Sequence, residues 1–191
     1  NAPSIVELLQ QVLAERNRRN QRIVRTMQEN GLSVSLESLQ EKYPGAIIGR
    51  PHFAAALVEL GLADNIRDAF SRYLNFGQKY FFKREYIPIP DAFAAIRGAG
   101  GKAVIAHPLQ YRMPEEELLQ MIRILKSAGA VGMECLYSTY SPEQMADLQL
   151  LAEHFALCVT GGSDFHGIGK PHIEMGMPGV PYHILEELKR R

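Results

Sequence analysis

The chain has 191 residues, and its 21 Lys and Arg residues balance its 21 Asp and Glu residues, so the formal net charge is zero. This balance gives no support for a broad positive field that would attract nucleic acid or a membrane, so an acidic ligand must meet a local cluster of cations. Both cysteines, Cys135 and Cys158, lie in apolar runs, and no apolar run has the length of a membrane span. These features predict a cytoplasmic protein with reduced cysteines and no disulfide framework.

The first part of the chain has the pattern of a long helix. The sequence begins at Asn1 without a methionine and enters this pattern at once, which suggests that a preceding segment is missing. Apolar residues then recur at helical spacing, and the pattern ends at Asn30 and Gly31. Four arginines lie between residues 16 and 22, and they either bind phosphate or form a solvated helical face.

Residues 14–88 are expected to form a small helical subdomain without a strand. Short helices are predicted at residues 35–43, at 51–60 and from an Asp64 cap to residue 73. Residues 77–86 form an aromatic and basic loop. This loop either meets a base and a phosphate, with Lys83 and Arg84 as candidates, or is a linker whose aromatic residues pack on the core.

Arg50 and His52 flank Pro51 at the predicted start of the second of these short helices. Proline is favoured in the first turn of a helix. The free amides and the dipole of a helix N-terminus favour an anion, and arginine adds a bidentate fork for phosphate. The residues therefore indicate either a phosphate site or a capped helix start with an incidental histidine.

The rhythm changes after residue 88 to an alternation of helices and short apolar strands, which is typical of a parallel sheet covered by helices, an α/β fold. Three strands are few for such a sheet, so the missing beginning or a partner chain is expected to supply others. Strands are predicted at residues 102–106, 131–135 and 155–160, and helices at 91–97, 115–128 and 142–154.

Polar side chains gather where these three strands end. His107 follows the first strand, Glu134 lies at the end of the second, and Asp164 and His166 follow the third. Function in alternating α/β folds gathers at the carboxyl ends of strands, and such oxygen and nitrogen donors suit a divalent cation. An extended backbone would let Asp164 and His166 point the same way. Glu134 either orients a ligand imidazole or pairs with a Lys or Arg. The alternative is a polar loop in which Asp164 caps a turn.

The motifs Gly162-Ser163-Asp164-Phe165-His166, Ala103 to Pro108 and Arg50 to Ala54 resemble the PHP (polymerase and histidinol phosphatase) superfamily. The chain is most similar to its bacterial metal-dependent phosphoesterases, which act on nucleotides and RNA 5′ ends. The resemblance implies part of a distorted (βα)7 TIM-like barrel. Residues 1–13 would end a barrel helix, residues 14–88 would form an inserted helical subdomain, and residues 89–191 would be the C-terminal part of the barrel.

The resemblance also implies two or three divalent metal ions, Mn, Zn or Fe, with His107, Asp164 and His166 as ligands. Asp164 and His107 are then the catalytic candidates, and Arg50 and His52 would bind the substrate phosphate. The reaction would be hydrolysis of a phosphate ester of a nucleotide or short RNA or DNA oligonucleotide by a metal-activated water. The His-x-His motif that opens the family is absent from the sequence. The alternatives are therefore a non-catalytic binding or regulatory module, a truncated inactive fragment, or an interaction protein that docks through its helices.

Overall fold

The computed structural model describes residues 2–167 and 170–191. The chain divides into two compact units, of which one comprises Asn1–Leu8 with Ile87–Arg191 and the other comprises Leu9–Tyr86. We call them the sheet unit and the helical unit. No helix of the described residues is both long enough and apolar enough to cross a membrane.

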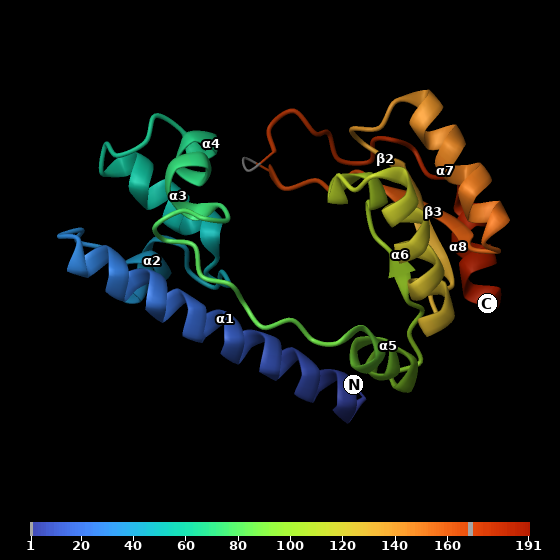
Figure 1. Ribbon diagram of the computed structural model, residues 1–191, viewed down its shortest axis with the longest axis horizontal. Coiled ribbons are helices and arrows are strands. Elements are labelled where there is room, and N and C mark those ends of the chain that lie inside the picture. Colours follow the sequence, from blue (N-terminus) through green and yellow to red (C-terminus); the bar gives the residue numbers. More distant parts are fainter. Residues whose placement is uncertain (1, 168–169) are drawn as a thin grey trace. The chain divides into compact units, whose positions relative to one another are not determined.

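The helical unit contains no strand in its described residues (Figure 1). Its core is formed by apolar side chains that are fully buried, among them Ile23, Met27, Phe53, Leu57 and Leu74. Burying such side chains, at about 1.5–3 kcal/mol each, holds these short helices together. The elements are most of α1 (Pro3–Glu29), then α2 (Leu36–Lys42), α3 (Arg50–Glu59), α4 (Ile66–Ala69) and the π-helix η1 (Phe70–Leu74).

The predicted cap at Asp64 is wrong, because the helix cap is Asn65. The Asn65 side chain accepts a hydrogen bond of 3.0 Å from the amide of Asp68, three residues on, which is the reach that an N-cap needs. Asp64 instead donates its own amide to the Asp68 carboxylate at 3.1 Å. The α-helix that follows lasts about one turn and continues as η1.

The sheet unit is a parallel sheet covered by helices, so the α/β prediction is confirmed. The strands pair in the order β1-β2-β3, and both pairings are parallel. Helix α7 packs on β2 and β3, and α8 packs on β3. The elements are α5 (Ile89–Gly98), β1 (Val104–Ile105), the 3-10 helix η2 (Pro108–Tyr111), α6 (Glu115–Ala128), β2 (Gly132–Tyr137), α7 (Pro142–His154), β3 (Cys158–Gly162) and α8 (Tyr182–Arg190).

The third strand starts three residues later than predicted because the end of α7 uses those residues. The amide of Leu157 bonds the Ala152 carbonyl at 2.8 Å, and the amide of Ala156 bonds the Glu153 carbonyl at 2.9 Å. This is the Schellman pattern of a helix end, in which one residue takes the left-handed conformation. Ala156 takes that place with a φ of 48°. Apolar residues 155–157 therefore end a helix, and β3 begins at Cys158.

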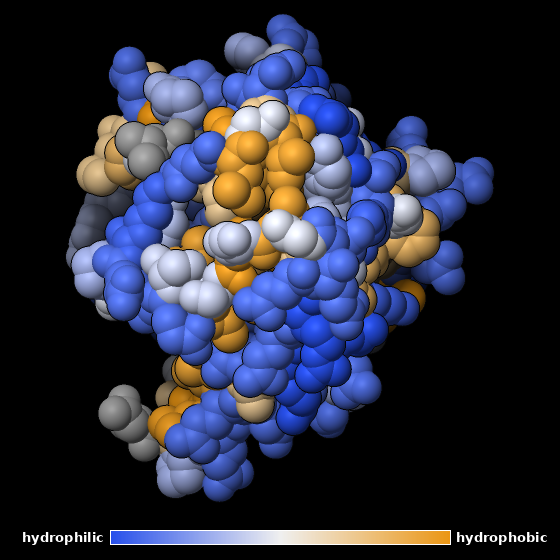
Figure 2. Space-filling view, turned by 90° about the vertical axis from the view of Figure 1, so that its left-hand side faces the viewer, coloured by the Kyte–Doolittle hydropathy of each residue, from blue (hydrophilic) through white to orange (hydrophobic). Residues whose placement is uncertain are grey.

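The molecular face in Figure 2 is largely hydrophilic, with apolar side chains gathered in limited patches. Single exposed apolar residues are normal on a protein surface. Phe76 and Tyr86, at 85% and 73% exposure, are among the most exposed large apolar or aromatic residues of the helical unit.

Candidate functional site

The carboxyl ends of the three strands lie at one edge of the parallel sheet, where ligand sites of α/β folds form. His107 follows β1 by two residues, Tyr137 is the last residue of β2, and Asp164 follows β3 by two residues. Contacts link the three side chains. The Tyr137 hydroxyl donates a hydrogen bond of 2.7 Å to Asp164 Oδ2, and the rings of His107 and Tyr137 meet edge to face at 5.8 Å. The structure therefore brings His107 and Asp164 to the same buried tyrosine.

The backbone at His107 is left-handed, with a φ of 31°, although proline generally favours an extended conformation in the residue before it. Its amide donates a hydrogen bond of 2.7 Å to Glu134 Oε2. That bond, together with Pro108 opening η2, fixes the turn. A sparsely populated conformation of this kind costs about 1–3 kcal/mol and is found mainly at functional sites.

Glu134 has a role that neither prediction anticipated. It accepts from the main chain of His107 instead of orienting the imidazole, and the ion pairs of the described residues do not include it. It also does not end its strand, because β2 continues to Tyr137. Glu134 thus places the backbone that carries His107.

An irregularity in β2 allows Glu134 and Tyr137 to serve one site. Glu134 pairs with Thr160 and Leu136 with Gly161, so Cys135 is an extra residue opposite none. Residues three apart in a regular strand point to opposite faces, and a bulge shifts this alternation by one. Both Glu134 and Tyr137 consequently contact His107.

Burial raises the pKa of the Cys135 thiol to about 12, which argues against a thiolate ligand.

Tyr137 was missed by sequence reasoning. The available signal was the apolar run that continues through Leu136 and Tyr137, which should have lengthened the predicted strand. The bulge itself has no signal in the sequence. The pKa of Tyr137 is raised by burial and by its hydrogen bond to Asp164, so the hydroxyl keeps its proton and acts as the donor.

Asp164 and His166 come together, but on a turned backbone. Asp164 has a φ of 50°, so the extended geometry expected for this pair is wrong. His166 Nδ1 lies 3.4 Å from Asp164 Oδ1 and 2.7 Å from the Asp164 carbonyl oxygen. A proton on Nδ1 would be donated to that carbonyl oxygen and would leave a lone pair on Nε2. An imidazole nitrogen and a carboxylate oxygen are therefore available side by side.

Lys170 forms an ion pair with Asp164 Oδ2, and its ammonium also lies 3.5 Å from the Tyr137 hydroxyl. Burial raises the pKa of Asp164, but the hydrogen bonds from Lys170 and Tyr137 outweigh it and bring the pKa below 3.8. The hydrogen bond to Asp164 raises the pKa of Lys170 above 10.5. The carboxylate is therefore ionised and already faces a positive charge.

The residues at this edge fit a divalent cation in donor chemistry. His107 Nδ1 is buried and has no hydrogen-bond partner among the described residues, and such an orphaned nitrogen suits a metal ligand. Within residues 2–167 and 170–191, however, no group of three or more His, Cys, Asp or Glu side chains is arranged to hold an ion. The metal centre of His107, Asp164 and His166 stays a prediction.

The Lys170–Asp164 pair predicts a pH dependence of stability in protein freed of metal by a chelator. Because the pKa of Asp164 is lowered on folding, its contribution is present above pH 3.8 and is lost as the pH falls through the lowered pKa. Lys170→Met should flatten this acid loss, since only the Tyr137 bond remains. Urea unfolding from about pH 7 to pH 3 measures it. Lys189→Met, an exposed change on α8, is the control, and equal pH profiles for both variants would contradict the prediction.

In the helical unit, His52 closes the start of α3. Its Nδ1 accepts a hydrogen bond of 3.0 Å from the Gly49 amide, and its ring packs edge-on against Tyr43 at 4.6 Å. It is not among the residues that line the neighbouring cavity. A capping role is therefore visible for His52, and its predicted contact with substrate stays a prediction.

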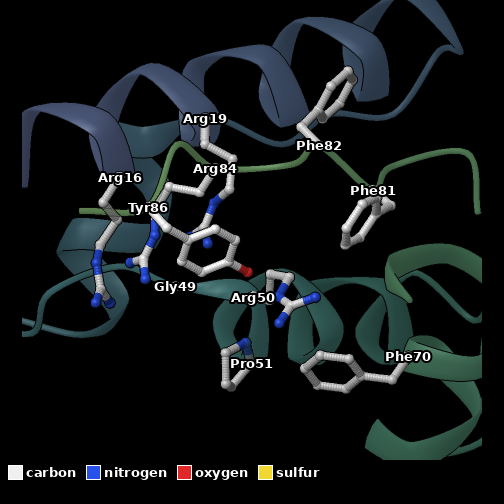
Figure 3. A pocket seen from close by; sticks show the side chains of 10 residues that line it. All are labelled: Arg16, Arg19, Gly49, Arg50, Pro51, Phe70, Phe81, Phe82, Arg84 and Tyr86. Carbon is white, nitrogen blue, oxygen red and sulfur yellow. The ribbon is translucent and has the colours of Figure 1, made fainter. Parts of the chain in front are cut away.

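Arg50, by contrast, faces a cavity of about 300 Å³ (Figure 3). Its guanidinium lies 5.8 Å and 5.9 Å from the ring centres of Phe70 and Phe81. Three further arginines line this cavity, and of these only Arg84 was singled out individually from the sequence. The lining residues are Arg16, Arg19, Gly49, Arg50, Pro51, Phe70, Phe81, Phe82, Arg84 and Tyr86.

Sequence comparison finds relatives that act on phosphate esters. The chain is 33% identical over 174 residues to the 5'-3' exoribonuclease Rnm of Escherichia coli K12, covering 91% of this chain and 59% of the relative. It is 34% identical over 149 residues to the 3',5'-nucleoside bisphosphate phosphatase of Chromobacterium violaceum, covering 76% of this chain and 52% of the relative. The chain thus spans somewhat more than half the length of these relatives, and no family model matches it.

Two solved structures share the fold over 98% of this chain. One is a Bifidobacterium adolescentis protein assigned as a metal-dependent phosphoesterase, with a TM-score of 0.83, 29% identity and 66% of its own length covered. The other is a Chromobacterium violaceum amidohydrolase with bound sulfate and no metal, with a TM-score of 0.81, 28% identity and 67% of its length covered. Sequence relatives and solved structures together point to the PHP-type phosphoesterase family, which the strand-end motifs also resemble.

Proposed function

We propose that the protein is a metal-dependent phosphoesterase that hydrolyses phosphate esters of nucleotides or of the 5′ ends of short oligonucleotides. The observation that carries the proposal is the meeting of His107 and Asp164 at Tyr137, at the carboxyl edge of the sheet. The names of the relatives supply the substrate class, since they include an exoribonuclease and a nucleoside bisphosphate phosphatase.

In this proposal His107, Asp164 and His166 hold two or three divalent ions, Mn, Zn or Fe, together with residues outside this group. A bound divalent cation lowers the pKa of a water ligand from about 16 to near neutrality, which supplies the nucleophile. The chain's own residues prepare this site. Tyr137 holds Asp164 Oδ2, which leaves Oδ1 for the cation, and Glu134 holds the backbone of His107.

Asp164 and His107 are also the side chains proposed to act on protons. The Asp164 carboxylate is ionised at neutral pH because Lys170 and Tyr137 overcome the effect of burial on its pKa, so it carries no proton of its own and can orient the attacking water by accepting its hydrogen bond. His107 Nδ1, which has no hydrogen-bond partner in the part of the chain that the structure describes, is a second acceptor at the same edge.

For the architecture, we propose that residues 89–191 are the C-terminal part of a distorted (βα)7 barrel, that residues 1–13 end one of its helices, and that residues 14–88 are an inserted helical subdomain. In that subdomain Arg50 binds a phosphate group of the substrate. A guanidinium offers two parallel donors to phosphate oxygens, and the start of a helix adds its dipole. His52 is proposed to assist from the third position of α3.

Metal analysis with a substrate screen tests the function. We expect the full chain to contain bound Mn, Zn or Fe and to release phosphate from nucleotides or 5′-phosphorylated oligonucleotides, with activity lost on chelation and restored by added metal. Bound nucleotide without hydrolysis in the metal-loaded chain would instead support the alternative of a non-catalytic binding module or inactive fragment. Absence of both metal and hydrolysis would overturn the proposal.

A further inference from the structure

Four guanidinium groups converge on the cavity of the helical unit. Arg16 and Arg19 come from α1, Arg50 is the first residue of α3, and Arg84 follows the helices of the unit. Figure 3 shows all four around one space, with the ring of Tyr86 among them. The Arg16 guanidinium reaches the start of α3, since Nη1 lies 3.6 Å from where a side-chain carbon on Gly49 would stand. We call the cavity that these four arginines line the arginine cavity.

The positive charge of the arginine cavity is not balanced by the described residues. The ion pairs of the described residues in the helical unit use other cations, namely Arg18, Lys42 and Arg72. The Nε atoms of Arg16 and Arg19 are buried and have no hydrogen-bond partner in the described part of the chain. Burial, and then the charges of Arg50, Arg16 and Arg84, lower the pKa of Arg19 to about 10. Such repulsion and unmet donors are costly unless an anion enters.

The walls between the arginines are aromatic. Phe70, Phe81, Phe82 and Tyr86 line the cavity, and the Arg84 guanidinium lies 5.6 Å from the centre of the Tyr86 ring. Tyr86 is 73% exposed, so a face of its ring is open to a ligand. Exposed rings beside cations are the arrangement with which proteins stack unpaired bases and neutralise the backbone of single strands.

We propose that Arg16, Arg19 and Arg84, with Tyr86, bind a nucleotide unit that carries more than one phosphate group, beyond the single phosphate assigned to Arg50. Four guanidiniums exceed what one phosphate dianion neutralises, and the aromatic walls fit a base that simple anions lack. A volume of about 300 Å³ lies at the lower end of the range for small-ligand pockets, which suits one nucleotide unit. The choice of a nucleotide rests on the proposed function, and its source is either a free bisphosphate or one unit of single-stranded RNA.

The test is calorimetric titration of the full chain in EDTA, so that binding is measured without hydrolysis. The probes are adenosine 3′,5′-bisphosphate, a 5′-phosphorylated adenylate trimer, and inorganic pyrophosphate, which has no base. Arg19→Gln should weaken all three by about tenfold or more and reduce the salt slope for the trimer by roughly one. Tyr86→Leu should weaken the two adenine probes by about tenfold and leave pyrophosphate unchanged.

Arg25→Gln is the matched control, because Arg25 is an exposed arginine of the same helix and is not in the cavity lining. It should leave all three affinities unchanged. The melting temperature without ligand should not fall in Arg19→Gln, since one of four repelling charges is removed. Arg84→Gln repeats the binding test at a residue outside α1. Tighter binding of the trimer than of the bisphosphate assigns the site to RNA, and the reverse order assigns it to free nucleotides.

Equal losses in Arg19→Gln and Arg25→Gln, or wild-type affinity in both Arg19→Gln and Arg84→Gln, would overturn the arginine cavity as a binding site. A loss of pyrophosphate binding equal to that of adenine probes in Tyr86→Leu would overturn the stacking. These outcomes are separate from the proposed function. If the chain binds the probes in EDTA but shows no hydrolysis with metal, the arginine cavity is supported and the proposed function is not. If the chain hydrolyses substrate but the variants bind as tightly as the wild type, the proposed function is supported and the arginine cavity is not.

Discussion

Replacing Asp164 with asparagine is expected to abolish metal-dependent phosphate release while the fold is retained. Asparagine keeps the size of the side chain but removes the charge that a divalent cation and Lys170 both require. The Tyr137 hydroxyl can still donate to the amide oxygen, so the local geometry is preserved. Loss of an anionic ligand should lower turnover by at least about 100-fold, more than removing a supporting partner does. Phosphate release and metal content of purified protein measure the effect.

Asp147→Asn is the control, because it removes the same charge from an exposed position on α7. It should keep full activity and full metal content. Full activity in Asp164→Asn would remove Asp164 from the site. Normal metal content with lost turnover would instead move Asp164 from metal binding to orienting the attacking water, which is the other role proposed for it.

Local sequence patterns were sufficient to predict the α/β class of the sheet unit and the sheet edge at which the candidate site lies. Apolar runs separated by helical periodicity predict parallel strands covered by helices, and parallel strands end at one edge. That reasoning selected His107, Asp164 and His166 without knowledge of their contacts. Its errors concern the ends of elements, where tertiary contacts decide. The Schellman turn at the end of α7 includes residues 155–157, which were predicted to belong to the third strand. The second strand continues past the bulge at Cys135 to Tyr137.

The parts that the sequence did not reveal depend on residues far apart in the chain. Glu134 accepts a hydrogen bond from the amide of His107, which lies 27 residues before it, and no short-range pattern links the two. The arginine cavity joins α1 to the segment after η1, so arginines that predict a solvated helical face meet Arg50 and Tyr86 only in the folded chain. Lys170 was not selected either, because no pattern in the sequence relates a lysine to an aspartate six residues before it.

Gly161→Ala is expected to disrupt the pairing of β2 and β3 that places Tyr137 beside Asp164. A side-chain carbon on Gly161 would stand 2.5 Å from both Cβ and the backbone oxygen of Leu136, and real contacts of this kind are essentially never so short. Leu136 pairs directly with Gly161 after the bulge, so the backbone must move. Overpacking of this kind lowers the free energy of unfolding by about 1–3 kcal/mol.

Hydrogen exchange resolves this effect from unfolding of the helical unit. Amides of Gly132–Tyr137 and Cys158–Gly162 should exchange faster in Gly161→Ala, while those of α3 keep their rates. Gly179→Ala is the matched control, since a side-chain carbon there meets no atom within 4 Å and should leave both sets unchanged. Because the strand shift would also separate Tyr137 from Asp164, the pKa of that carboxyl should rise toward its ordinary value. Unchanged exchange in β2 and β3 would show that the close approach of the two strands is not what fixes the site.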